Sequence, residues 1–203
     1  SLRTHGLHHG LLPLIDVILE QPGGQRFIAA ALAKTAARVR EGRNVSPAFL
    51  FATLLWHEVL GQWNAAKARG ERALPALFDA MDRVLGQQAE QIAIPRRFEA
   101  TIKEIWSLQP RFEQRSGGRP FRLLEHPRFR AGWDFLDLRC RSGELEGDHA
   151  GLADWWARFA DAGPDAREAM LKPDEAPQKR RRSRGRGRKH RDGASDAGAA
   201  PAE

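Results

Sequence analysis

The sequence is poor in cysteine and in long apolar runs, and both absences narrow the class of protein. Its 203 residues contain one cysteine, Cys140, which excludes a disulfide framework and a zinc site of four thiolates. No apolar run approaches the ~20 residues of a membrane-spanning helix, so we expect no transmembrane segment. The polar, histidine-rich start at residues 1–10 does not resemble a signal peptide. These absences predict a cytoplasmic protein, and the missing initial methionine indicates a fragment or a processed chain.

The signatures of common catalytic sites are missing as well. The sequence has no phosphate-binding loop and no Gly-x-Gly-x-x-Gly run, and His57-Glu58 lacks the second histidine of a zinc-protease helix. His5, His8 and His9 offer imidazoles for a metal ion, but no carboxylate or thiolate accompanies them, so a polar terminus is the favoured alternative. We therefore predict no catalytic residue, no metal ligand and no cofactor site in this chain.

Two pairs of carboxylates, each one helical turn apart, are the remaining candidates for binding a cation. They are Asp79 with Asp82 and Asp134 with Asp137. Such pairs more often lie on a solvated helix face or pair with a nearby arginine, such as Arg130. We favour that interpretation over a metal site.

Apolar residues recur at helical spacing along most of the chain, and no segment alternates with a period of two. The sequence therefore predicts an all-α fold, with a multi-helix body over roughly residues 5–171. Ser46-Pro47 predicts the start of a helix that ends near Gly70 and, being apolar nearly all round, lies at the centre of the body. Cys140 lies on an apolar helical face and is expected in the core. Other helices are expected at residues 11–19 and 27–39, from Pro75, Pro95 and Pro127, and last at residues 152–159.

One proline is expected to interrupt a helix. Pro110 follows the segment that begins at Pro95, and proline has no N–H to donate and clashes with the preceding turn. The sequence therefore predicts a break at Pro110, which leaves the path of Arg111 to Arg115 open.

The net charge of +7 is distributed unevenly along the chain. Residues 96–130 carry a net charge of +5, and residues 131–177 carry a net charge of −6. Residues 178–191 contain nine basic residues and no acid. From Pro173 onward the chain has too few apolar residues to offset the entropy of ordering it, so we expect this tail to be disordered.

The basic residues between 96 and 130 are interleaved with aromatic ones. Arginine can bind phosphate oxygens with two N–H groups and stack on bases, which suits single-stranded RNA. An ordinary helix surface above core aromatics explains the same spacing equally well. The candidate RNA-binding residues here are Arg96, Arg97, Lys103, Arg111, Arg115, Arg119, Arg122, Arg128 and Arg130.

The tail gives a second electrostatic signal. Nine cations without a counter-charge attract any polyanion through counterion release, so this signal alone does not separate RNA from DNA or from acidic lipid. A solvated tail without a dedicated partner is the alternative. The tail candidates are Lys179, Arg180, Arg181, Arg182, Arg184, Arg186, Arg188, Lys189 and Arg191. The predicted parts of the chain are a helical body (1–95), a basic helical RNA-binding region continuing the same fold (96–172) and a disordered arginine-rich tail (173–203).

Four short runs occur in the order in which one known family has them. The runs are Ser46 to Ala52 (SPAFLFA), Ile94 to Arg97 (IPRR), Ile105 to Gln109 (IWSLQ) and the distinctive Leu123 to Ala131 (LLEHPRFRA). With Trp155-Trp156 and the arginine-rich tail, they resemble the C-terminal region of bacterial poly(A) polymerases. The resemblance covers nearly the whole chain.

The resemblance implies a parent enzyme of two parts. Its N-terminal head is a nucleotidyltransferase domain, in which a Gly-Ser pair and two aspartates one residue apart bind ATP and magnesium. Neither element occurs in this sequence, so the chain is expected to lack the catalytic head and to be inactive alone. The parent would add AMP from ATP to RNA 3′ ends, in mRNA polyadenylation and RNA decay. This portion would bind single-stranded RNA 3′ ends without sequence preference, with RNA-decay proteins as further candidate partners.

Two other functions stay open at this point. One is a stand-alone RNA-binding adaptor that is encoded without a head. The other is the corresponding body of a CCA-adding tRNA nucleotidyltransferase, which is related to the same family. The arginine-rich tail and the Leu-Glu-His-Pro run favour the poly(A) polymerase.

Overall fold

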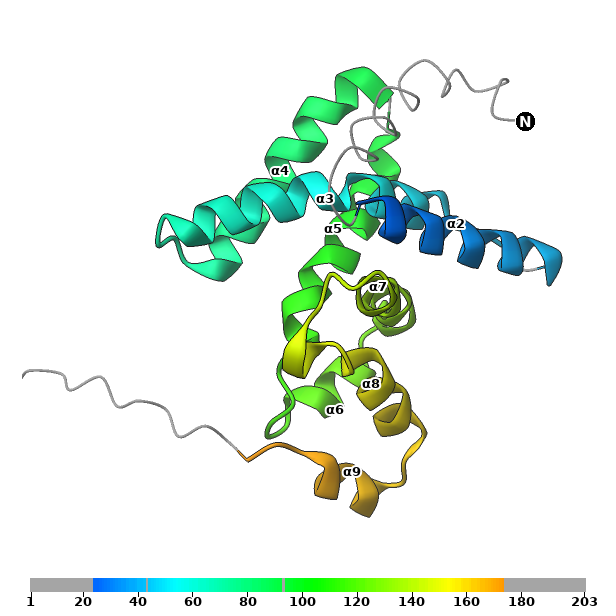
Figure 1. Cartoon of the computed structure of the whole chain (residues 1–203), viewed down its shortest axis with the longest axis vertical. Coiled ribbons are helices and arrows are strands. Elements are labelled where there is room, and N and C mark those ends of the chain that lie inside the picture. The colour runs from blue at the N-terminus through cyan, green and yellow to red at the C-terminus, as the bar shows by residue number, and fades with distance from the viewer. Residues whose placement is uncertain (1–23, 43, 93, 174–203) are drawn as a thin grey trace, which may run out of the picture.

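Helices make up the regular structure of this protein, for which a computed structural model describes residues 24–42, 44–92 and 94–173 (Figure 1). Within these ranges there is no strand, and two residues, Ser116 and Lys172, form an isolated parallel bridge. The predicted all-α fold is confirmed. The helix expected at residues 11–19, the histidines at positions 5, 8 and 9, and the tail from residue 174 lie outside the described residues. The elements are α2 (Gly24–Arg40), α3 (Pro47–Ala68), α4 (Ala73–Ile92), α5 (Arg96–Phe112), α6 (Arg119–Leu124), α7 (Phe129–Arg141), the 3₁₀ turn η2 (Gly147–His149), α8 (Leu152–Asp161) and α9 (Pro164–Met170).

Helix α3 lies at the centre of the first half of the fold, as its sequence predicts. Ser46 is extended and Pro47 fits the first helical turn, while Gly70 stops the helix with a φ of +85°. The Ser46 side chain makes no capping hydrogen bond, so the proline and the extended backbone set this start. Ten α3 side chains are buried, and α2, α4 and α5 all pack against the helix.

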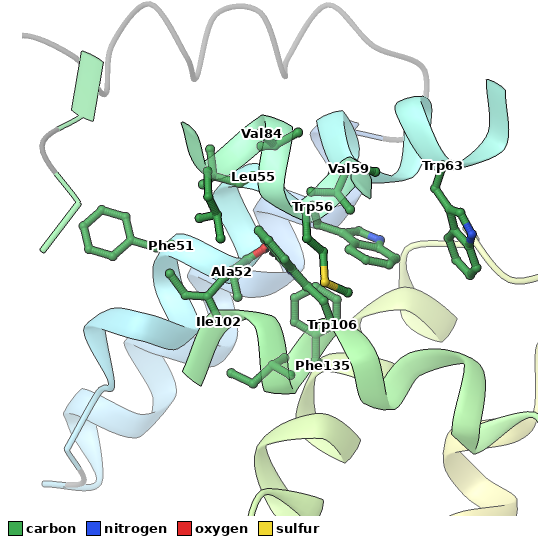
Figure 2. Packing of buried hydrophobic residues seen from close by; sticks show 14 of the residues in the cluster. Phe51, Ala52, Leu55, Trp56, Val59, Trp63, Val84, Ile102, Trp106 and Phe135 are labelled. Carbon is green, nitrogen blue, oxygen red and sulfur yellow. Dashed lines mark hydrogen bonds between the residues drawn. The ribbon is translucent and has the colours of Figure 1, made fainter. Parts of the chain in front are cut away.

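Large aromatic side chains fill the first hydrophobic cluster, which joins α2, α3, α4, α5 and α7 (Figure 2). The Trp56 ring meets Phe135 edge to face, with centroids 5.3 Å apart, and lies 6.4 Å from Trp106. The indole N–H of Trp106 donates to the carbonyl oxygen of Ala52 at 3.1 Å, so this buried polar group is satisfied. The contact ties α5 directly to the centre of α3.

A second hydrophobic cluster joins the C-terminal part of α5 to α6, α7 and α8. The Trp156 ring meets Phe112 edge to face at 5.2 Å, and its N–H donates to the Phe112 carbonyl oxygen at 2.8 Å. Phe159 stacks on Trp155, with centroids 4.8 Å apart. Both α5 and α7 contribute side chains to the two clusters. In Figure 1, α5 connects the two ends of the molecule. The predicted division at residue 95 stays a prediction.

The break expected at Pro110 is wrong. Helix α5 includes Pro110 and continues to Phe112. Proline removes the hydrogen bond to the carbonyl of Trp106 and no other, and it does so in the last turn, where the helix ends two residues later. The buried Phe112 side chain anchors this turn in the second cluster. Arg111 therefore lies on α5, and Arg115 lies in the loop that follows.

A short helix near the end of the described chain was missed. Helix α9 follows Gly163, which precedes a proline at the first helical position and an aspartate in the first turn. These are ordinary helix-start signals, so the start of α9 could have been predicted from the sequence. None of its residues is buried, which explains why apolar periodicity did not reveal it.

Gly132 on α7 is predicted to be a close-packing position. A Cβ atom there would lie 2.8 Å from Leu108 Cδ1 and 3.2 Å from Phe112 Cε2, both on buried side chains. We expect Gly132→Ala to lower the free energy of unfolding by about 1–2 kcal/mol, because overpacking outweighs the gain in helix propensity. Gly61→Ala on α3 is the matched control, since no atom lies within 4 Å and a gain of up to ~1 kcal/mol is expected. Urea denaturation measures both, and equal stabilisation of the two variants would contradict the close packing.

Candidate nucleic-acid interface

The structure separates the nine cations predicted between residues 96 and 130 into groups. Arg96 and Arg97 lie in the first turn of α5, and Arg111 lies in its last turn. Arg111 follows Arg96 by fifteen positions on the α-helix, which corresponds to ~22 Å along the helix axis. The two ends of α5 are therefore different places on the molecule (Figure 1). They do not form one compact patch.

The cations between these ends are paired with acids. The Lys103 ammonium lies 2.6 Å from Asp82 Oδ1. Arg128 Nε lies 2.9 Å from Glu104 Oε2, and Arg128 also donates to Thr101 Oγ1 at 3.4 Å. Exposed pairs of this kind contribute at most ~1 kcal/mol to stability, but they neutralise the local charge that a phosphate would meet.

The carboxylates of α7 are likewise paired. Arg130 Nε lies 3.4 Å from Asp134 Oδ2, and Lys34 Nζ of α2 lies 2.9 Å from Asp134 and 3.1 Å from Asp137. Asp137 also binds Arg141 at 2.8 Å. The prediction that these carboxylates pair with cations is confirmed. In the part of the chain that the structure describes, no group of three or more His, Cys, Asp or Glu side chains is arranged to bind a metal ion.

Four arginines at the far end of α5 differ from Lys103, Arg128 and Arg130, which have acidic partners. We call Arg111, Arg115, Arg119 and Arg122 the distal arginine cluster. None of them forms an ion pair with a described residue. Arg96 and Arg97, at the other end of α5, likewise form no ion pair with a described residue. Arg119 donates to Ser116 Oγ at 3.4 Å, and the Arg115 guanidinium lies 5.8 Å from the centre of the Trp155 ring. Arg119 and Arg122 are exposed, so their N–H groups can reach an external phosphate.

The loop between α5 and α6 brings the cluster together. Gly117 has a φ of +57°, which favours glycine, and the chain turns there so that α6 follows at once. Ser116, Arg119 and Arg122 thus lie within one short turn and helix. Glu113 and Glu125, the acids of the same segment, form no ion pair with these arginines, and residues 111–125 carry a net charge of +2.

The end of the described chain lies beside the same loop. The backbone N–H of Lys172 donates to the carbonyl oxygen of Arg115 at 2.9 Å, next to the bridge between Lys172 and Ser116. In Figure 1 the last described residues run past the loop that follows α5. The last described residues, Lys172 and Pro173, therefore lie beside the loop that carries Arg115. Sequence reasoning missed this contact, because no local pattern marks a pairing between residues 116 and 172.

One known protein family matches the part of the chain that contains most of these basic residues. The family described as "Polymerase A arginine-rich C-terminus" matches residues 69–190, which is more than half of the chain. The chain belongs to this family. The match contains the distal arginine cluster and every predicted tail cation except Arg191.

Curated relatives extend the match to nearly the whole chain. Poly(A) polymerase I of Salmonella typhi is 38% identical over 197 residues, which cover 93% of this chain and 42% of the relative. Poly(A) polymerase I of Escherichia coli O6:H1 is 39% identical, covering 90% of this chain and 40% of the relative. The protein of the same name from Haemophilus influenzae is 34% identical, covering 86% and 39%. The chain thus spans about two fifths of the length of these relatives, and the predicted resemblance is confirmed.

One arginine of the family region is buried and serves the fold. Arg139 on α7 has a side chain that is 4% exposed, and its Nε lies 2.8 Å from Glu144 Oε1. Arg139 also donates to Gln109 Oε1 at 3.3 Å, and Glu144 Oε2 accepts the Trp56 N–H at 2.7 Å. This network joins α3, α5, α7 and the following loop. It is inaccessible to RNA, and we name it the Arg139 network.

The packing around two ionisable side chains, Cys140 and His57, shifts their pKa values. Cys140 is half-buried and packs against the edge of the second hydrophobic cluster, so the prediction of a core position holds only in part. Burial raises the pKa of its thiol, which disfavours the reactive thiolate. Burial lowers the pKa of His57, although the nearby Glu144 opposes this shift. His57 packs edge to face on Phe27 with centroids 5.1 Å apart. Neither group forms a catalytic arrangement. No helix in the described ranges has the length and apolarity to cross a membrane.

Proposed function

We propose that this chain is the RNA-binding C-terminal portion of a poly(A) polymerase. The parent enzyme would add AMP from ATP to RNA 3′ ends, in mRNA polyadenylation and RNA decay. The observation that carries the proposal is the distal arginine cluster, whose four cations form no ion pair with a described residue, whereas Lys103, Arg128 and Arg130 do. Relatives named Poly(A) polymerase I support this assignment over a CCA-adding enzyme or a separate adaptor.

The chemistry of this portion is binding and orientation. Arginine N–H groups donate to phosphate oxygens in charge-assisted hydrogen bonds, which hold a strand without reading its sequence. The released counterions supply a large share of the affinity at low salt. In the parent enzyme, such contacts would keep the RNA near the site where its 3′ end reacts.

ATP and magnesium do not fit the residues present here. The sequence contains no Gly-Ser pair and no two aspartates one residue apart. The carboxylate pair on α7, Asp134 with Asp137, is occupied by Lys34, Arg130 and Arg141. Nucleotidyl transfer on metal ions is therefore assigned to other parts of the parent enzyme.

A salt titration of RNA binding tests the proposed function. The purified chain is mixed with a labelled single-stranded RNA of ~20 nucleotides, and the Kd is measured by fluorescence anisotropy between about 50 and 300 mM salt. Four phosphate contacts predict a slope of log K against log salt near −3, since each contact contributes about −0.7, and the tail makes the slope steeper. A flat salt response, or no binding at ~50 mM salt, would contradict the proposal. Extension of a primer with ATP and magnesium by this chain alone would contradict its predicted inactivity.

A further inference from the structure

We propose that Arg130 and Trp133 on α7 form a stacking site for one base of a single-stranded RNA. The base would lie on the outer face of the Arg130 guanidinium, which itself lies over the indole ring, and the outer N–H groups of Arg130 would bind the adjacent phosphate. This inference rests on the proposed function. It adds a contact with a base to the phosphate contacts of the distal arginine cluster.

The first support is the stacked arrangement of the two side chains. The Arg130 Cζ atom lies 4.8 Å from the centre of the Trp133 ring, a distance at which a guanidinium packs on an aromatic face. The Arg130 side chain is 72% exposed, although the ring beneath it is half-buried. Bases of single-stranded RNA stack on arginine guanidinium planes as well as on aromatic rings. Among the described residues, no other exposed arginine lies over a tryptophan.

The second support is that both side chains are held in place by other parts of the fold. The Trp133 N–H donates to the carbonyl oxygen of Ala153 on α8 at 2.9 Å, which fixes the orientation of the ring. Arg130 Nε lies 3.4 Å from Asp134 Oδ2, and Lys34 lies 2.9 Å from the other oxygen of this carboxylate. Side chains that are already ordered lose less conformational entropy when a ligand binds.

A second exposed arginine lies over an aromatic ring but lacks these restraints. The Arg97 Cζ atom lies 4.9 Å from the centre of the Phe98 ring. Arg97 forms no ion pair with a described residue, and a phenylalanine ring has no N–H with which to fix its orientation. A phenylalanine face also attracts a cation less strongly than an indole face. We therefore assign the stacking site to α7.

The third support is the set of free donors on Arg130 and their place in the fold. The ion pair with Asp134 uses Nε, and neither Nη atom of Arg130 donates to a described residue. These N–H groups can bind a phosphate oxygen beside the stacked base. The ring of Phe129, which precedes Arg130, lies 5.8 Å from the ring of Phe112, which follows Arg111 of the distal arginine cluster. Helix α7 thus begins beside the end of α5 that carries the cluster, which allows one strand to contact both.

The test exchanges Arg130 for lysine in the full chain. Arg130→Lys keeps the positive charge beside Asp134 but removes the planar group on which a base stacks. We expect a roughly tenfold higher Kd for a single-stranded RNA of ~20 nucleotides, which corresponds to the loss of about one stacked base, with an unchanged salt slope. Arg128→Lys is the matched control, because Arg128 is exposed and paired with Glu104 but lies over no aromatic ring of a described residue. Its Kd is expected to change less than about twofold.

A second probe shows whether the lost contact is with a base. An abasic strand of the same length keeps the phosphates and has no base to stack, so Arg130→Lys is expected to bind it as tightly as the unaltered chain does. Equal losses with both probes, or no loss with RNA, would overturn the stacking site and leave the proposed function standing. Failure of the unaltered chain to bind RNA would instead contradict the proposed function. A thermal melt of each variant shows that the body remains folded.

Competition with free AMP distinguishes a base within a strand from a mononucleotide. An excess of AMP is expected to leave the RNA bound, because AMP competes for one contact among several. Displacement of the RNA from the unaltered chain would assign the site to a mononucleotide and overturn the inference.

Discussion

Replacing Glu144 with alanine is expected to lower the free energy of unfolding by about 3–5 kcal/mol. The cause is that the substitution leaves the buried Arg139 side chain without its acidic partner. Arg139 has a side chain that is only 4% exposed, and Glu144 is the acid that neutralises it at 2.8 Å. Without Glu144, a guanidinium charge remains in the interior with Gln109 as its remaining hydrogen-bond acceptor. The Trp56 N–H also loses the acceptor that it binds at 2.7 Å.

Two further variants identify the buried charge as the cause. The double variant Arg139→Met with Glu144→Gln removes both charges and keeps an acceptor for Trp56, so it should be more stable than Glu144→Ala. Glu146→Ala is the matched surface control, because Glu146 is exposed and is expected to change stability by less than about 0.5 kcal/mol. Chemical denaturation monitored by tryptophan fluorescence measures all three. A cost for Glu144→Ala no larger than that of Glu146→Ala would show that the network is not essential to the fold.

The parts of this fold that could be predicted from the sequence are those set by local chemistry. Ser46-Pro47 and Gly70 fix the ends of α3 through backbone preferences alone, so the boundaries of this helix were predicted correctly. The break at Pro110 was wrong because the cost of one lost hydrogen bond depends on tertiary packing. The burial of Phe112 in the second cluster outweighs that cost. A local rule fails where a distant contact provides the larger energy.

In the candidate site, too, local contacts could be predicted from the sequence and distant contacts could not. The pairing of Arg130 with Asp134 follows from their spacing of four residues on one helix, and the structure contains it. Lys103 and Arg128 are paired with acids more than twenty residues away in sequence, so no pattern could distinguish them from the unpaired arginines. The sequence therefore predicted nine equivalent cations. The structure ranks them: Lys103, Arg128 and Arg130 have acidic partners, and the other six form no ion pair with a described residue.

That ranking leads to the largest expected effect on RNA binding. We expect the double variant Arg119→Gln with Arg122→Gln to raise the Kd for a single-stranded RNA roughly 100-fold at low salt. Each lost charge-assisted hydrogen bond to phosphate is worth about 1.5–3 kcal/mol, which is tenfold or more. The salt slope should become shallower by about 1.4, since two phosphate contacts contribute about −0.7 each. Fluorescence anisotropy over a range of salt concentrations measures the Kd and the slope together.

The matched control removes two cations that already have acidic partners. Lys103→Gln with Arg128→Gln changes the net charge by the same amount, but Asp82 and Glu104 balance the two cations that it deletes. We expect the Kd to rise less than about threefold and the salt slope to stay nearly constant. Equal losses in the two double variants would mean that RNA responds only to the overall charge of the chain. A selective loss in the distal variant would instead show that the strand contacts the end of α5 where the tail begins.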